Sequence, residues 1–197
     1  MIKTTTGMML FLFQITIANG SVITFEPPPC LICNSQLNDY EEAGLRFSGN
    51  ASHHNTIISG SADNGSSGVI RFAFMGSMSI QRSDGDTFSL HGVELAEYSD
   101  TLIGTQNTIT FTGTRSGATT PVVQQFTIDG MIDGAGGMDD FESFTFSTDF
   151  TDLVRVDVTG NLLTLDNLRI NAVPIPAAAW LFISGLLTLA GISNRRI

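Results

Sequence analysis

The residues of this 197-residue chain that could do chemistry are few and scattered. Its histidines are His53, His54 and His91, and its cysteines are Cys30 and Cys33. His53 and His54 lie in a polar stretch without the H-E-x-x-H spacing of a zinc site, so exposed loop histidines are favoured over metal ligands. No G-x-S-x-G elbow, P-loop or dinucleotide-binding fingerprint occurs. We therefore predict no catalytic residues and a protein that is not an enzyme.

The acidic residues do not form a recognisable catalytic pair either. Glu94 and Glu97 are three positions apart, which turns them to opposite faces of a strand, so they do not match the facing carboxylates of a glycosidase. Four aspartates between positions 129 and 140 lie among glycines but miss the spacing of an EF-hand loop. This pattern is more typical of turns than of a calcium loop.

The cysteines form a C-x-x-C pair after three prolines, in the segment PPPCLICN. In an oxidising compartment Cys30 and Cys33 can close a small disulfide loop, which is the favoured interpretation. Free thiols are the next alternative. A redox site would need a helix N-terminus at this motif, and a zinc site would need two further ligands from the three histidines.

The first twenty residues have the order of a secretory signal peptide. Lys3 supplies the positive start, Met8 to Ile17 the apolar stretch, and Ala18 and Gly20 the small residues that a signal peptidase requires. We predict export through the Sec translocon with cleavage after Gly20. The mature chain then begins near Ser21.

Residues 21–172 have the length of one domain and a strongly acidic composition. They contain all nineteen carboxylates and six arginines but no lysine, a balance of −13. Such a surface argues against nucleic acid and anionic lipid as partners, because both attract basic patches. It is compatible with a soluble exported protein, with divalent cations or with neutral sugars.

Apolar residues in this segment alternate with polar ones and are bounded by clusters of Gly, Asn, Asp and Ser. The alternating runs predict many short strands and no amphipathic helix, hence an all-β antiparallel β-sandwich, most simply a jelly roll. They are Val22 to Phe25, Leu45 to Phe47, Ile70/Phe72/Phe74, Val93/Leu95, Ile109/Phe111, Phe126/Ile128, Phe144/Phe146, Val154/Val156/Val158 and Leu163/Leu165. A β-helix solenoid is the alternative, but no repeat of fixed length supports it.

The last of these runs changes phase. In the segment 163–170 the apolar positions are 163 and 165, then 168 and 170. A β-bulge at Asp166 and Asn167 would keep both halves facing the core. On the preceding strand, Arg155 and Asp157 are expected to form a solvent-facing pair.

The final twenty-five residues read VPIPAAAWLFISGLLTLAGISNRRI. Pro174 and Pro176 favour extended backbone before a helix. The sixteen residues 177–192 would span about 24 Å as a helix, which is marginal for a bilayer of about 30 Å. Trp180 and the basic pair Arg195 and Arg196 are suited to the two interfaces, with the C-terminus in the cytoplasm.

This tail closely resembles the PEP-CTERM sorting signal of Gram-negative, biofilm-forming bacteria. The resemblance covers the whole of 173–197: a V-P-x-P box at Val173, Pro174, Ile175 and Pro176, then the apolar helix with Trp180, then Arg195 and Arg196. Ile175 stands where the family often has glutamate. The resemblance implies a transient anchor in the inner membrane, cleavage by an exosortase near the box, and delivery to the cell surface or extracellular matrix of strains that make exopolysaccharide.

The segment between the two signals has a shorter resemblance. The stretches 23–26, 42–47 and 165–170 are similar to galactose-binding-like jelly rolls often carried by this class. In that fold a structural calcium ion often braces loops near the first strand, which implies Glu26, Asp39 and Asp166 as its carboxylates. No other cofactor is implied.

Three functions follow as expectations. The first is a non-catalytic exported surface or matrix protein whose β-sandwich binds carbohydrate, such as the exopolysaccharide itself. The second is a purely structural matrix protein without a small ligand. The third, and least favoured, is a secreted hydrolase, which would need convergent carboxylates or a Ser-His pair in one cleft.

Overall fold

The computed structural model of the protein describes residues 20–26, 35–55, 68–98, 106–131 and 141–171. These residues belong to one compact unit, Gly20–Val173. They form thirteen strands and the turns between them: β1 (Ser21–Ile23), β2 (Ser35–Gln36), β3 (Tyr40–Glu42), β4 (Leu45–Gly49), β5 (Ser52–Asn55), β6 (Gly68–Phe72), β7 (Gly76–Arg82), β8 (Leu90–Glu97), β9 (Thr108–Arg115), β10 (Val122–Thr127), β11 (Glu142–Thr145), β12 (Leu153–Gly160) and β13 (Leu163–Ile170).

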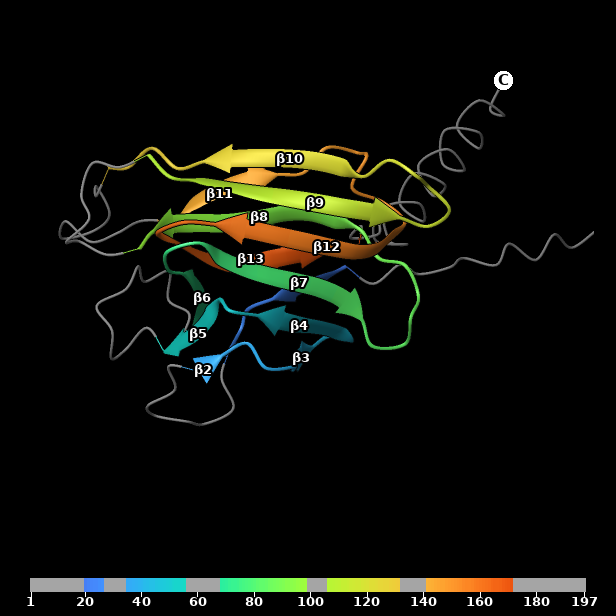
Figure 1. Cartoon of the computed structure of the whole chain (residues 1–197), viewed down its shortest axis with the longest axis horizontal. Coiled ribbons are helices and arrows are strands. Elements are labelled where there is room, and N and C mark those ends of the chain that lie inside the picture. The colour runs from blue at the N-terminus through green and yellow to red at the C-terminus, as the bar shows by residue number, and fades with distance from the viewer. Residues whose placement is uncertain (1–19, 27–34, 56–67, 99–105, 132–140, 172–197) are drawn as a thin grey trace, which may run out of the picture. The chain divides into compact units, whose positions relative to one another are not determined.

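The strands pair antiparallel in two sheets that lie one over the other (Figure 1). The seven-stranded sheet has the order β11-β8-β13-β6-β5-β2, and β1 pairs with β13 beside β6. The six-stranded sheet has the order β10-β9-β12-β7-β4-β3. From β6 to β13 the chain crosses repeatedly from one sheet to the other, as in a jelly roll. The predicted all-β antiparallel sandwich is therefore confirmed.

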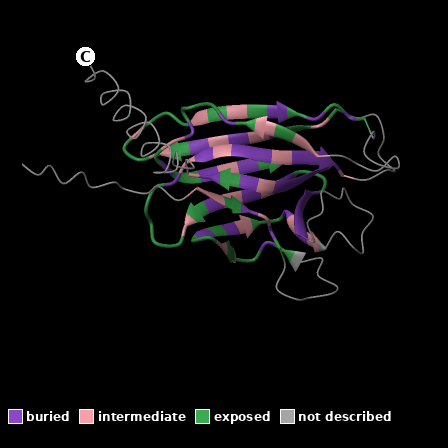
Figure 2. Ribbon diagram, turned by 180° about the vertical axis from the view of Figure 1, so that it is seen from behind, coloured by how far each residue is buried: buried purple, intermediate pink, exposed green. Residues whose placement is uncertain are grey.

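The core lies between the two sheets because apolar and polar residues alternate along the strands. Figure 2 shows buried and exposed residues alternating along several strands. Phe111, Phe126, Phe146 and Phe150 pack as a cluster with ring centroids 4.9 to 5.8 Å apart. Each fully buried side chain of this size contributes roughly 1.5–3 kcal/mol to folding.

The predicted alternation fails at two residues. Phe74 was expected to face the core with Ile70 and Phe72, but β6 ends at Phe72 and Phe74 is 77% exposed in the turn that follows. Val154 was expected to be buried with Val156 and Val158, but it is 37% exposed. The register between β12 and β9 shifts between Leu153 and Arg155, so Leu153 takes the inward position instead.

The phase change in β13 is resolved as predicted. The register between β13 and β8 shifts between Asp166 and Arg169, and Asn167 has a positive φ of 45°. Leu163, Leu165, Leu168 and Ile170 are all buried. The β-bulge therefore keeps both halves of β13 on the core.

Within the described residues no helix is long and apolar enough to span a bilayer. The segment 177–192, predicted to do so, lies outside the described residues, as do the sorting residues Val173, Pro174, Ile175, Pro176, Trp180, Arg195 and Arg196. Ala18, Cys30 and Cys33 also lie outside them.

Candidate functional site

A groove of about 400 Å³ lies at the end of the seven-stranded sheet where β1 pairs with β13. Strand pairing builds it: Thr145 of β11 is opposite Gly92 of β8, Gly92 is opposite Arg169 of β13, and Arg169 is opposite Val22 of β1. These residues form one row across four strands on the outer face of the sheet. Among the described residues, the groove is lined by Gly20, Ser21, Val22, His91, Thr145, Arg169, Ile170 and Asn171.

The β-bulge in β13 places Arg169 in this groove. Because the bulge restores the phase of the strand, Leu168 and Ile170 face the core and Arg169 between them faces solvent. Gly92 then provides the room that the guanidinium occupies. A Cβ at position 92 would overlap the guanidinium of Arg169, so the side chain lies closely against the backbone of β8.

The side chain of Arg169 has no partner among the described residues, unlike the side chains of Arg46, Arg82 and Arg155. Arg46, Arg82 and Arg155 each bind an aspartate, with Arg155 and Asp157 forming the predicted solvent-facing pair. The side chain of Arg169 makes no hydrogen bond or ion pair within the described part of the chain. The side chain of Arg115 on β9 also makes none there, but Arg115 does not line this groove. The donors of Arg169 are therefore available to a ligand.

The other groove residues add polar groups and one exposed apolar side chain. The Nε2 atom of His91 is buried and has no hydrogen-bond partner among the described residues. Thr145 is exposed, and its carbonyl accepts a hydrogen bond from Gln124 Nε2. Val22, which is 47% exposed, supplies apolar surface. The groove thus combines several hydrogen-bonding groups with apolar surface, a combination found in small-ligand sites.

A polar network beside the groove holds the bulge in place. Asn167 donates from Nδ2 to Glu94 Oε2 over 2.8 Å, and its backbone N–H donates to Asp166 Oδ1 over 2.7 Å. Asp166 is fully buried and stands opposite Glu94 in the sheet. Asp166, one of the predicted calcium ligands, therefore supports the backbone of the bulge.

The two other predicted calcium ligands have separate contacts. The backbone carbonyl of Glu26 accepts a hydrogen bond from the Tyr40 hydroxyl, and Asp39 binds Arg46 at 2.8 Å. Glu26, Asp39 and Asp166 are not among the groups of three potential ligands that the described residues bring together. Calcium binding by these residues stays a prediction.

The described residues do bring together three other carboxylates. Glu97, Asp129 and Glu142 have ligand oxygens within 4.8 Å of one another. Glu97 is only 4% exposed, and Glu142 Oε1 accepts a hydrogen bond from the backbone N–H of Asp129. Glu97 and Glu142 lie on strands of one sheet, whereas Asp129 follows β10 of the other. Sequence reasoning missed this group because only folding makes these three positions neighbours.

Glu42 joins the first strand to the six-stranded sheet. Its carboxylate accepts hydrogen bonds from the backbone N–H groups of Thr24 and Phe25, at 3.0 Å each, and from the Tyr40 hydroxyl at 2.9 Å. Burial, followed by the hydrogen bond to Glu42, raises the pKa of Tyr40, so the hydroxyl remains a donor. His53 Nε2 donates to the Phe25 carbonyl over 2.6 Å. These polar groups serve the structure of the domain.

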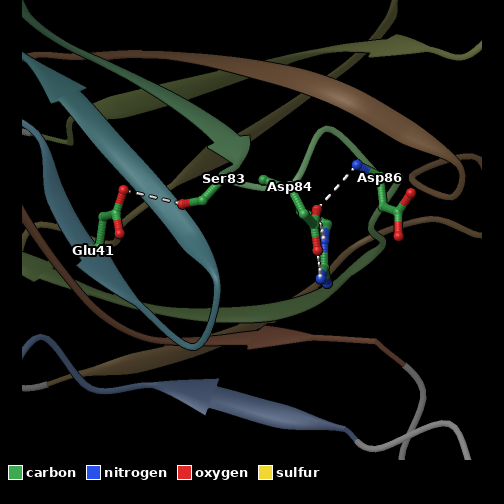
Figure 3. Close-up of polar contacts among 5 residues, drawn as sticks. Glu41, Ser83, Asp84 and Asp86 are labelled. Carbon is green, nitrogen blue, oxygen red and sulfur yellow. Dashed lines mark hydrogen bonds and ion pairs between the residues drawn. The ribbon is translucent and has the colours of Figure 1, made fainter.

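The polar side chains of the acidic turn between β7 and β8 also bind other groups of the protein (Figure 3). Asp84 accepts hydrogen bonds from Arg82 Nε at 2.8 Å and from the backbone N–H of Asp86 at 3.0 Å. The hydrogen bond from Arg82 is the main reason that the pKa of Asp84 lies below its usual range. Ser83 Oγ donates to Glu41 Oε1 over 3.1 Å. The side chains of this turn therefore stabilise the turn itself.

No protein-family profile and no curated protein sequence matches this chain. Among solved structures, a family 29 carbohydrate-binding module is similar at 14% identity and a TM-score of 0.41, over 79% of this chain and 93% of that one. A family 28 module, described as specific for non-crystalline cellulose, is similar at 10% identity and a TM-score of 0.38, over 74% of this chain and 93% of that one.

A peptidoglycan O-acetylesterase is similar at 15% identity and a TM-score of 0.42, over 72% of this chain. This chain spans only a third of the esterase, 33% of its length. Because these TM-scores lie below 0.5, the fold assignment rests on the strand pairing of this chain itself.

Proposed function

We propose that this protein is an exported, non-catalytic protein of the cell surface or extracellular matrix whose β-sandwich binds carbohydrate. In this proposal an exosortase processes the tail, and the ligand is a polysaccharide such as the exopolysaccharide around the cell. Support for export comes from the order of residues at 1–20 and 173–197. Support for carbohydrate binding comes from the groove.

The observation that carries the proposal is the position of Arg169. The bulge and Gly92 hold its guanidinium in the groove, and no protein group occupies its donors within the described residues. Sugar hydroxyls and ring oxygens are acceptors for such donors, and hydrogen bonds to a charged group are worth about 1.5–3 kcal/mol each. Thr145 and Asn171 can bind further hydroxyls. Val22, which is 47% exposed, can pack against the C–H face of a sugar ring.

A glycan array probed with the full chain in mild detergent tests carbohydrate binding, with and without calcium. The best ligand is then titrated calorimetrically against Arg169→Ala and Gly92→Ala. We expect each substitution to weaken binding about tenfold or more, which corresponds to about 1.4 kcal/mol. The first removes the donors, and the second adds a methyl group where the guanidinium lies.

Arg155→Ala is the matched control, because it removes an exposed arginine from the six-stranded sheet instead. It should bind as the wild type does. A blank array in both calcium conditions would overturn carbohydrate binding. Unchanged affinity in Arg169→Ala would overturn the groove as its site.

A further inference from the structure

We infer that the groove selects a sugar that carries a carboxylate, and that Arg169 binds this carboxylate through two parallel hydrogen bonds. The inference rests on the proposed function and names the class of ligand for the same groove. Its basis is a difference between Arg169 and the arginines that share its local sequence pattern.

In two places an arginine binds an aspartate two residues further along the chain. Arg82 binds Asp84, and Arg155 binds Asp157 through both Nε and Nη2. At the third such place, Arg169 is followed two residues later by Asn171, which is the uncharged counterpart of aspartate. Asn171 lines the groove together with Arg169. The carboxylate that the other two arginines receive from the chain is therefore missing where a ligand can enter.

The donors of Arg169 match the geometry of a carboxylate. A guanidinium presents its N–H donors as a planar fork that fits the two oxygens of a carboxylate. None of the described residues that line the groove is Asp or Glu, so none of them competes for this fork. The remaining polar lining residues, His91 and Thr145 among them, add no negative charge.

The acidic surface of the domain does not prevent this contact. Two carboxylates on the same sheet face already have contacts: Glu94 accepts from Asn167, and the buried Asp166 opposite it accepts from the backbone of Asn167. Charges further away are largely screened, because the Debye length is about 8 Å at physiological ionic strength. The net charge would disfavour nonspecific adhesion of a polyanion. Selectivity for an acidic sugar must then come from the short-range contact with Arg169.

The test compares an oligogalacturonate of defined length with the same oligosaccharide after its carboxylates are reduced to alcohols. Titrations use the full chain in mild detergent with EDTA present, so that calcium cannot bridge two carboxylates. We expect the wild type to bind the acidic form at least tenfold more tightly. Asn171→Asp should abolish this preference, because it places a carboxylate in the groove that Arg169 lines.

Asn161→Asp is the matched control, since it makes the same change in the turn at the opposite end of β13. It should keep the preference of the wild type. Asn171 has a φ of 55°, a conformation that aspartate tolerates, and a thermal melt monitors the fold of the variant.

The outcomes separate the inference from the proposed function. Equal binding of the acidic and reduced oligosaccharides, lost in Arg169→Ala, would overturn acid selectivity and leave carbohydrate binding in place. A preference that survives in Asn171→Asp would also overturn the inference. Binding of neither form, together with a blank glycan array, would overturn the proposed function as well.

Discussion

At the scale of single residues, Gly92 and Asn171 shape the groove because the first has no side chain and the second has no charge. Gly92 has no Cβ, and this leaves the space in which the guanidinium of Arg169 lies. Asn171 has no charge, and this leaves the guanidinium without a carboxylate from its own strand end. Either residue would look unremarkable in a list of polar and small side chains. Each matters because strand pairing brings it to Arg169.

His54 is a second residue whose environment determines its chemistry. It lies half-buried on β5, and its Nδ1 atom has no hydrogen-bond partner among the described residues. Burial is the main cause that lowers the pKa of His54 to about 4, and the charges of Arg71 and His53 act in the same direction. Arg71 is itself held over the ring of Tyr98, 4.0 Å from the ring centroid. His54 therefore stays neutral in the folded domain at pH values at which a free histidine takes up a proton.

This pKa predicts an acid sensitivity that His54→Gln removes. Below the ordinary histidine pKa of about 6.5 the unfolded chain binds a proton at His54 that the folded domain does not bind. Stability from this residue is present above pH 6.5 and is lost as the pH falls toward 4. Between pH 7 and pH 4 the wild type should lose about 1 kcal/mol more than the variant, a figure reduced for partial exposure of the ring.

Urea unfolding at a series of pH values measures this difference. The carboxylates titrate equally in both proteins, so the gap between the two curves isolates His54. Parallel curves across the whole range would contradict the lowered pKa.

At the scale of elements, two asparagines hold the turn between β6 and β7. Asn50 Oδ1 accepts hydrogen bonds from the backbone N–H of Ser77 at 2.6 Å and from its hydroxyl at 3.0 Å. Asn161 Oδ1 accepts from the backbone N–H of Met75 at 3.3 Å. Met75 has a positive φ of 55°, so the chain reverses directly after Phe72. This reversal is why Phe74 points to solvent although its spacing predicted the core.

The end of β4 next to this turn depends on a glycine. Gly49 has a φ of 153°, and a Cβ there would overlap the carbonyl oxygen of Ser77 and lie 2.9 Å from Met78 Cα. Both obstacles are backbone of β7 and cannot rotate away. We expect Gly49→Ala to destabilise the domain by about 3 kcal/mol or more, from backbone strain and overpacking together.

Gly85→Ala provides the comparison for this prediction. Gly85 also has a positive φ, 81°, but a Cβ there would meet no atom within 4 Å. Its substitution should cost about 1–2 kcal/mol from the left-handed conformation alone. Chemical denaturation of the two variants measures both values, and equal losses would show that crowding at Gly49 is unimportant.

At the scale of the whole domain, the described chain enters and leaves at the same end. Ser21 pairs with Ile170, so Gly20 and Asn171 both lie beside the groove. The turn with Phe74 follows Phe72, which pairs with Leu163 at the other end of β13. Eight residues of strand separate the two ends by roughly 25 Å. The groove thus lies at the ends of β1 and β13 that are next to the two predicted signals in the sequence.

The predicted sorting signal is tested by its own substitutions. Pro174→Ala, or loss of Arg195 and Arg196, should leave the protein as an unprocessed membrane form. The box is then no longer cut in the first case, and the basic end no longer sets the orientation in the second. Membrane fractionation with mass measurement of the mature product detects this, with a change at the exposed Ser143 as a control. Normal maturation of both variants would disprove the sorting prediction.

Several features of the domain could be predicted because they depend on neighbours in the sequence. The β-bulge at Asp166 and Asn167 follows from a local change of phase, and the Arg155–Asp157 pair from spacing of two on a strand. The errors at Phe74 and Val154 arose where a turn or a register shift interrupts the period. The strands β2, β3, β5 and β7 were not predicted, although Met78 and Ile80 alternate on the inward face of β7.

The sequence by itself therefore determined the all-β class, the inward faces of most strands and the bulge, because a period of two residues is a local property. Only the tertiary structure determined which residues lie around Arg169. Its neighbours Gly92, Thr145 and Val22 come from three other strands, and no spacing along the chain encodes which strands pair. The same holds for Glu97, Asp129 and Glu142, which meet across two sheets. The pairing of strands that are far apart in the sequence places Arg169 at the centre of the groove.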